Sequence, residues 1–188
     1  MNCYRTQTIL MITGVAIIVA LLIPKLSAIP LLGENEGYEP QQPIAYSHLL
    51  HAGELKIDCQ YCHYGASDSR HAGVPPLDVC MNCHKFITAP LGKIRAEMAL
   101  AKKEKRAPQR IVSPEIQKIY DALGLDERMA KDLKKAAKPM SWVKVYDLPD
   151  YVRFDHRRHV NVGVDCQDCY GQVETMERVR QVGTLSMG

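Results

Sequence analysis

The chain has 188 residues, with 24 Lys and Arg against 21 Asp and Glu and a formal net charge of +3. This length predicts one folded domain plus an appendage, and the absence of any recognition motif argues against nucleic-acid binding. Only 6% of the residues are aromatic, and few long apolar runs follow residue 32. We therefore expect bound cofactors to supply part of the apolar interior.

The first candidate element is residues 9–23 (ILMITGVAIIVALLI), a charge-free run between Arg5 and Lys25. Fifteen helical residues span about 22 Å, short of a hydrocarbon core of about 30 Å, and residues 26–32 would extend the run. A cleaved signal peptide is the alternative, but no good cleavage site follows. We predict that residues 1–32 form a cytoplasmic tail and one transmembrane helix in the inner membrane, which leaves the remaining chain on the periplasmic side.

Two further features flank this predicted anchor. Residues 33–43 are rich in Gly, Pro and Glu, a composition typical of a linker, so the folded domain is expected to cover residues 44–188. Cys3 precedes the apolar run, which is the wrong side for a lipoprotein cysteine. We expect it to be a free thiol.

Two complete C-x-x-C-H motifs follow, and they dominate the sequence. Two thiols three residues apart can each form a thioether to the same haem, and the next histidine then lies under the iron as its proximal ligand. The motif residues are Cys59, Cys62, His63, Cys80, Cys83 and His84. The pattern predicts covalently bound c-type haem, at least one group per motif.

Other chemistry is compatible with the same four thiols. They could form two disulfides, or a four-cysteine zinc site across the 17 residues that separate Cys62 from Cys80. Either alternative would make the chain a haem-free assembly module. Neither explains why a histidine directly follows the second cysteine of both motifs, so we prefer haem.

Spare histidines surround the motifs and are candidate distal ligands. His48 and His51 are three residues apart, so on a helical turn they project from one side and could reach two different irons. His71 lies in the loop between the motifs, where a histidine is often merely solvated. We regard it as a weaker candidate ligand.

Residues 91–138 form a basic stretch with 13 Lys and Arg against 7 Asp and Glu and no Cys or His. Residues 91–106 have helix-forming composition, and Ser113-Pro114-Glu115 predicts the start of a helix that ends at Gly124. Another helix is predicted from Asp126 to Pro139. We interpret the stretch as a solvated helical insertion without haem ligands. A docking surface for an acidic partner is the functional alternative.

The last part of the chain repeats the first motif with one difference. Residues 154–171 (FDHRRHVNVGVDCQDCYG) match residues 46–65 (YSHLLHAGELKIDCQYCHYG). Both segments contain, in this order, an aromatic residue, His-x-x-His, a glycine and a cysteine pair. The matching residues are His156, His159, Cys166 and Cys169. Tyr170 occupies the slot that follows the second cysteine, where His63 stands in the first copy.

Tyr170 leaves the third unit open to several interpretations. The tyrosine could bind iron as phenolate, or the haem could keep its thioethers and take its ligands from elsewhere. The unit could also have lost its haem and kept its thiols. The surplus of histidines predicts further haems, carried after Gly188 or by a partner subunit.

The motifs, together with SPEIQKIYDAL, SWVKVYDLPDYVRFDHRRHV and VDCQDCYGQVETMERVR, closely resemble the pentahaem cytochrome c subunit of bacterial alternative complex III. The resemblance implies a mainly α domain with much irregular loop, organised by covalent haems. It also implies partners: an iron–sulfur subunit, other quinol oxidoreductase subunits and a soluble electron carrier. The chain departs from the family at Tyr170 and Tyr146, where the family has histidine, and the family continues into further motifs.

The sequence therefore favours a non-catalytic electron-transfer subunit that passes electrons from a quinol-oxidising membrane complex to a periplasmic acceptor. Histidine on both sides of the irons would keep their potentials low. The rival hypothesis is an enzyme, a single-anchor multihaem quinol dehydrogenase that oxidises quinol itself. That activity would require a haem with an open axial position near the anchor.

Overall fold

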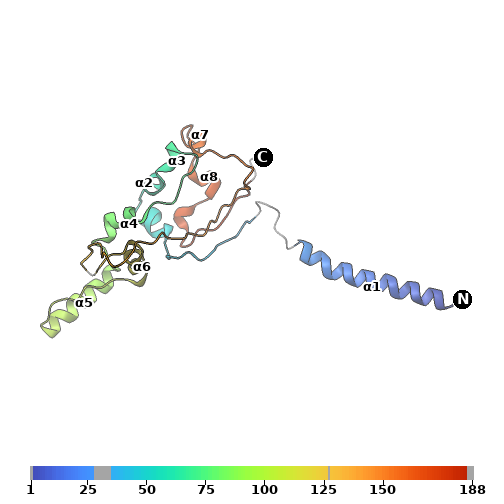
Figure 1. The fold of residues 1–188 in the computed structure, drawn as a ribbon, viewed down its shortest axis with the longest axis horizontal. Helices are drawn as coiled ribbons and strands as arrows, with labels where there is room; N and C mark the ends of the chain where they lie inside the picture. Colours follow the sequence, from blue (N-terminus) through green and yellow to red (C-terminus); the bar gives the residue numbers. More distant parts are fainter. Residues whose placement is uncertain (1, 28–34, 127, 186–188) are drawn as a thin grey trace.

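The computed structural model describes residues 2–27, 35–126 and 128–185. Across these residues it is mainly helical with long irregular connections, and its one β interaction is an isolated bridge between Leu125 and Lys131. This confirms the predicted class of a mainly α protein with much loop (Figure 1). The elements are α1 (Asn2–Ser27), η1 (Leu49–Glu54), α2 (Cys59–Cys62), α3 (Gly65–Asp68), α4 (Leu77–His84), α5 (Leu91–Glu104), α6 (Pro114–Leu123), α7 (His156–Val160), α8 (Cys166–Tyr170) and η2 (Val173–Thr175).

Helix α1 contains the apolar run, and the large apolar side chains of that run are exposed, including Leu10 and Met11. Within the part of the chain that the structure describes, no helix is long and apolar enough to cross a membrane. The predicted transmembrane helix is therefore not supported. The extension through residues 28–32 and the Cys3 side chain lie outside the described residues.

Residues 35–43, the described part of the predicted linker, are hydrogen-bonded to distant parts of the chain. Gly37 N–H donates to the Gln181 carbonyl at 2.7 Å, and Gln181 N–H donates to the Tyr38 carbonyl at 3.0 Å. The Gln42 side chain donates to and accepts from the backbone of Val143, both at 2.9 Å. This segment therefore packs along two later stretches of chain.

Helices α5 and α6 confirm two predictions. The Ser113 side chain accepts a hydrogen bond from Ile116 N–H, Pro114 occupies the first helical position, and Gly124 ends α6 with φ +68°. Each feature satisfies or avoids an unpaired backbone group at a helix end. The sequence signals for α6 were thus sufficient by themselves.

The predicted helix from Asp126 to Pro139 is wrong. In the described residues of this range the chain forms turns instead, because aspartate side chains accept local backbone N–H groups. Asp126 accepts from Arg128 and Ala130, and Asp132 accepts from Lys134. Such side-chain to backbone bonds compete with helix formation, and the segment has too little apolar surface to compensate.

The apolar core lies between α4 and α6. Ile44, Leu77, Ile119 and Tyr120 are buried there, and partly buried side chains that include Cys80 pack against them. Tyr120 also donates a hydrogen bond to the His84 backbone carbonyl. The second C-x-x-C-H motif is therefore fixed to α6 by both apolar packing and a hydrogen bond.

Candidate functional site

The two complete motifs lie on short helices. The Asp58 side chain accepts from Gln60 N–H at 2.8 Å and so caps α2, which carries the first pair of thiols. Helix α4 carries the second pair. The Asn82 side-chain amide donates to the Tyr61 hydroxyl at 2.9 Å, which ties α4 to α2. The motifs are thus held next to each other.

The thiols are unpaired in the structure. All six cysteines whose side chains it describes are free: Cys59, Cys62, Cys80, Cys83, Cys166 and Cys169. Among the described residues, no three metal-binding side chains gather into a group that could hold a metal ion. Among the described residues the thiols thus form neither a disulfide nor a clustered metal site.

The third pair of thiols lies against the first. Cys166 and Cys59 form a side-chain hydrogen bond, and burial together with the charge and hydrogen bond of Cys59 raises the pKa of Cys166. Burial also raises the pKa of Cys62 and of Cys80, with further effects from neighbouring thiols. These groups are therefore neutral thiols at pH 7, collected in one partly buried region.

Most of the histidines share one arrangement. In five of the seven, Nδ1 lies at hydrogen-bond distance from a backbone carbonyl oxygen. Because a carbonyl oxygen only accepts, Nδ1 is the donor, and in a neutral ring this leaves the lone pair on Nε2, the form in which histidine binds metals. The pairs are His51 to Ser47 (2.8 Å), His63 to Gly73 (2.6 Å), His84 to Ile87 (2.8 Å), His156 to Arg70 (2.8 Å) and His159 to Asp155 (3.1 Å).

His48 is different, because its Nδ1 is buried without a hydrogen-bond partner. Burial, with smaller contributions from His63 and His51, lowers its pKa to about 4. The ring is therefore neutral at pH 7 and lies close to His63. A buried, unpartnered imidazole nitrogen is costly in a core and is suited to a metal ligand.

His51 faces the second motif. The ring centres of His51 and His84 are 6.1 Å apart, with an angle of 60° between the ring planes. An imidazole nitrogen bonds a transition metal at about 2 Å, so two imidazoles on opposite sides of one iron have ring centres about 6 Å apart. The observed spacing therefore fits an axial pair.

The third unit reproduces the local geometry of the first. The Phe154 ring stacks on His159 (4.6 Å, 21°) and meets His156 edge-on (4.8 Å, 86°). In the first unit the Tyr46 ring makes the same two contacts, stacked on His51 (4.4 Å, 23°) and edge-on to His48 (4.8 Å, 83°). The repeat seen in the sequence is thus a repeat in three dimensions.

Tyr170 contacts the first histidine of the third unit. Its hydroxyl lies 2.9 Å from His156 Nε2, and because His156 Nδ1 is protonated, the hydroxyl donates this bond. Two ligand atoms on opposite sides of one metal lie about 4 Å apart, so this pair is in direct contact instead. Burial, Cys169 and Tyr146 raise the pKa of Tyr170 to about 12, so it is a neutral phenol. These residues do not fit a histidine-ligated haem.

Tyr146 belongs to the same cluster. Its ring meets the Tyr170 ring edge-on at 4.7 Å, and its hydroxyl accepts from Val182 N–H at 3.1 Å. Its hydroxyl also lies 3.3 Å from the Tyr170 and Arg180 carbonyl oxygens. The two positions at which the chain departs from the resembled family are therefore in contact.

His71 is not brought into any of these groups. It is exposed in the loop before α4, and among the described residues its ring makes no hydrogen bond. Sequence reasoning missed the carbonyls of Gly73, Ile87 and Arg70 that orient the other rings, since no side-chain pattern marks them. The aromatic residue two positions before each His-x-x-His was a detectable signal for the ring stacking.

No family model matches the chain. It is similar to the multihaem cytochrome c subunit of menaquinone reductase from Nitratidesulfovibrio vulgaris, with 24% identity over 135 residues. The alignment covers 70% of this chain and 47% of that protein, so the chain spans about half the length of its relative.

Proposed function

We propose that this chain is an electron-transfer subunit of a membrane quinol oxidoreductase and holds c-type haems covalently. The observation that carries the proposal is the His51–His84 pair, spaced at 6.1 Å beside free thiols of two C-x-x-C-H motifs. The similarity to a multihaem cytochrome c subunit supports the same cofactor. Haem, when bound, supplies an iron that cycles between ferric and ferrous states.

We assign the axial ligands from the geometry. His63, after the first pair of thiols, and His48, whose unpartnered ring is close to it, would hold one haem. His84 and His51 would hold the other. At His51, His63 and His84 the backbone carbonyls at Nδ1 fix the tautomer and increase the basicity of the ligating nitrogen. Neutral His48 needs no deprotonation before it binds.

The third unit is assigned separately. Cys166 and Cys169 keep the spacing for haem attachment, but the Tyr170 hydroxyl and His156 Nε2 satisfy each other. We propose that this unit accepts a haem only when a histidine replaces Tyr170. His159 has the same geometry as His51 and would serve an iron that none of the described motifs carries.

The finer assignment follows the sequence resemblance to alternative complex III. In that role the chain works at the periplasmic face of the inner membrane. It receives electrons from the quinol-oxidising subunits, including an iron–sulfur subunit, and delivers them to a soluble carrier. If paired histidines hold each haem as assigned, no iron would be open to quinol, which disfavours the rival quinol dehydrogenase. Quinol oxidation by the purified chain without partners would support that rival.

Intact mass and visible spectra of the purified chain test the proposal. We expect two covalently attached haems, one lost in the variant with Cys59→Ala and Cys62→Ala and the other lost with Cys80→Ala and Cys83→Ala. The matched control, Cys166→Ala with Cys169→Ala, leaves the count unchanged. A colourless protein, or thiols bridged to one another, would refute the proposed function.

A further inference from the structure

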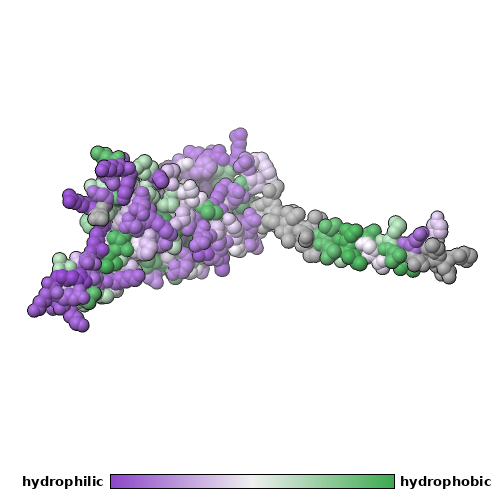
Figure 2. Space-filling model, turned by 60° about the horizontal axis from the view of Figure 1, so that its bottom comes forward, coloured by the Kyte–Doolittle hydropathy of each residue, from purple (hydrophilic) through white to green (hydrophobic). Residues whose placement is uncertain are grey.

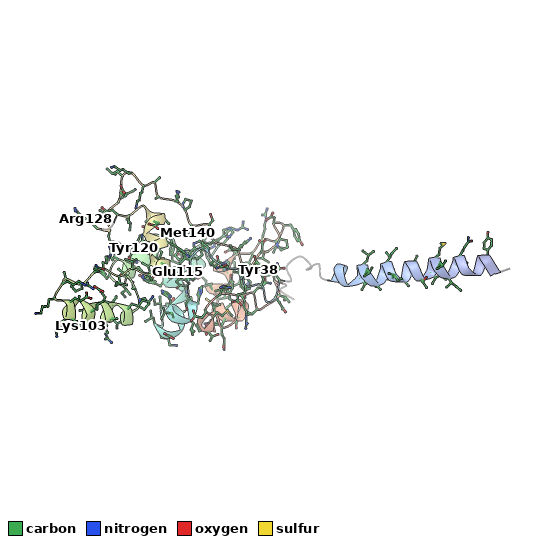
Figure 3. All side chains as sticks on the ribbon, turned by 90° about the horizontal axis from the view of Figure 1, so that it is seen from below. Tyr38, Lys103, Glu115, Tyr120, Arg128 and Met140 are labelled. Atoms are coloured by element: carbon green, nitrogen blue, oxygen red, sulfur yellow. The ribbon has the colours of Figure 1, made fainter. Side chains whose placement is uncertain are left out.

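The most basic part of the molecule is one end of the folded domain. Residues 91–138 carry 13 of the 24 Lys and Arg but only 7 of the 21 Asp and Glu, while the remaining chain is slightly acidic. Figure 3 shows the labelled Lys103 and Arg128 at the end of the domain opposite Tyr38. Figure 2 shows hydrophilic side chains over the same end. We call this region the basic end.

Among the described residues, two of these cations form ion pairs within the chain. Arg106 pairs with Glu97 and Glu104, and Lys118 pairs with Glu115. The exposed lysines of the basic end without an ion pair among the described residues lie on α5, at its C-cap and in the loop after Gly124. They are Lys93, Lys102, Lys103, Lys105, Lys131, Lys134, Lys135 and Lys138. Their field attracts anions and raises association rates with acidic surfaces.

An exposed apolar side chain lies among these cations. Leu133 is 97% exposed and follows Lys131 by two residues and precedes Lys134. An apolar contact surrounded by charges is typical of protein interfaces, where the charges steer and the apolar group anchors. A membrane surface would instead call for an amphipathic helix with a continuous apolar face, and this loop is not helical.

The basic end is joined rigidly to the second motif. Tyr120 of α6 donates to the His84 carbonyl, and Ser113 N–H donates to the Thr88 carbonyl at 2.8 Å. The Thr88 hydroxyl donates to the Ile111 carbonyl at 2.5 Å. A protein bound at the basic end would therefore lie on the side of the domain that carries Cys80, Cys83 and His84.

We propose that the basic end is the docking surface for a soluble redox protein with an acidic face, and that electrons leave through the haem of the second motif. The inference rests on the proposed function, because an electron-transfer chain needs an acceptor. The partner is defined by charge complementarity to the lysines and by a small apolar contact for Leu133.

The test is the affinity of the haem-loaded chain for a monohaem cytochrome c with an acidic surface, measured by titration calorimetry at several salt concentrations. A triple variant with Lys103→Glu, Lys134→Glu and Lys135→Glu should bind roughly tenfold more weakly at low salt, with a flatter salt dependence. The matched control changes the same net charge elsewhere, with Arg153→Glu, Arg178→Glu and Arg180→Glu. It should bind as the unmodified chain does.

Three outcomes overturn the docking surface: equal weakening in both triple variants, affinity independent of salt, or lysine-dependent binding only to phosphatidylglycerol vesicles. Haem absorbance is recorded for every sample and separates the two proposals. A chain without haem refutes the proposed function, whereas a haem-loaded chain with unchanged affinity in the lysine variant refutes the docking surface alone.

Discussion

The first and third units have the same local fold but differ at the position directly after the second cysteine. In both, an aromatic ring stacks on the second histidine of His-x-x-His, whose Nδ1 donates to the carbonyl four residues earlier. In the first unit the slot holds His63, which donates to the Gly73 carbonyl. In the third it holds Tyr170, which donates to His156. One residue thus decides whether the side chain in this slot bonds a loop carbonyl or the first histidine of its own unit.

The supporting glycines of the two units also differ. A side chain at Gly53 would meet the Glu174 carbonyl oxygen at 2.2 Å, so glycine is required there because η2 packs against η1. Gly163, the glycine between the histidines and the cysteines of the third unit, lies at a different offset and has open space around it, but its φ of +88° favours glycine. The glycine of each unit is therefore fixed by a different physical constraint.

The largest expected effect comes from giving the first unit the residue of the third. The substitution His63→Tyr should remove one covalent haem, about half of the haem absorbance, because thioether attachment without a proximal nitrogen leaves the iron without that ligand. Intact mass and the visible spectrum measure the loss. His71→Tyr, in the loop, is the control and should keep both haems. An unchanged haem count in His63→Tyr would contradict the assignment.

The reciprocal substitution, Tyr170→His, should add one haem per chain. It restores the motif beside Cys166 and Cys169 and frees His156 Nε2 from the tyrosine hydroxyl. The comparison variant Tyr146→His leaves Tyr170 in the slot and should add none. The idea fails if the unmodified chain already carries three haems, since the tyrosine would then tolerate attachment.

A smaller effect separates the caps of the two cysteine helices. The Asp58 side chain caps α2, whereas Asp165 makes no capping hydrogen bond to α8. We expect Asp58→Ala to lower the free energy of unfolding by about 1 kcal/mol and Asp165→Ala to change it by less than about 0.5 kcal/mol. Urea unfolding followed by far-UV circular dichroism measures both. Equal losses of unfolding free energy in the two variants would contradict the difference in capping between α2 and α8.

The amino-acid sequence determined the chemistry and the regular local structure. The spacing of cysteines and histidines identified the C-x-x-C-H motifs and the internal repeat, because these patterns involve residues close in the chain. The signals for α6 were likewise local, from Ser113 to Gly124. The predicted helix after Asp126 is wrong because the Asp126 side chain accepts hydrogen bonds from nearby backbone N–H groups, and these bonds compete with helical hydrogen bonds.

Only the tertiary structure decided which groups meet. His51 faces His84, and Tyr146 contacts Tyr170, across 33 and 24 positions of sequence. His156 is oriented by the Arg70 carbonyl, 86 residues away. Such contacts depend on the path of the whole chain and on backbone atoms that every residue carries. No side-chain pattern encodes these long-range contacts. They decide which histidine nitrogens are already hydrogen-bonded to another side chain.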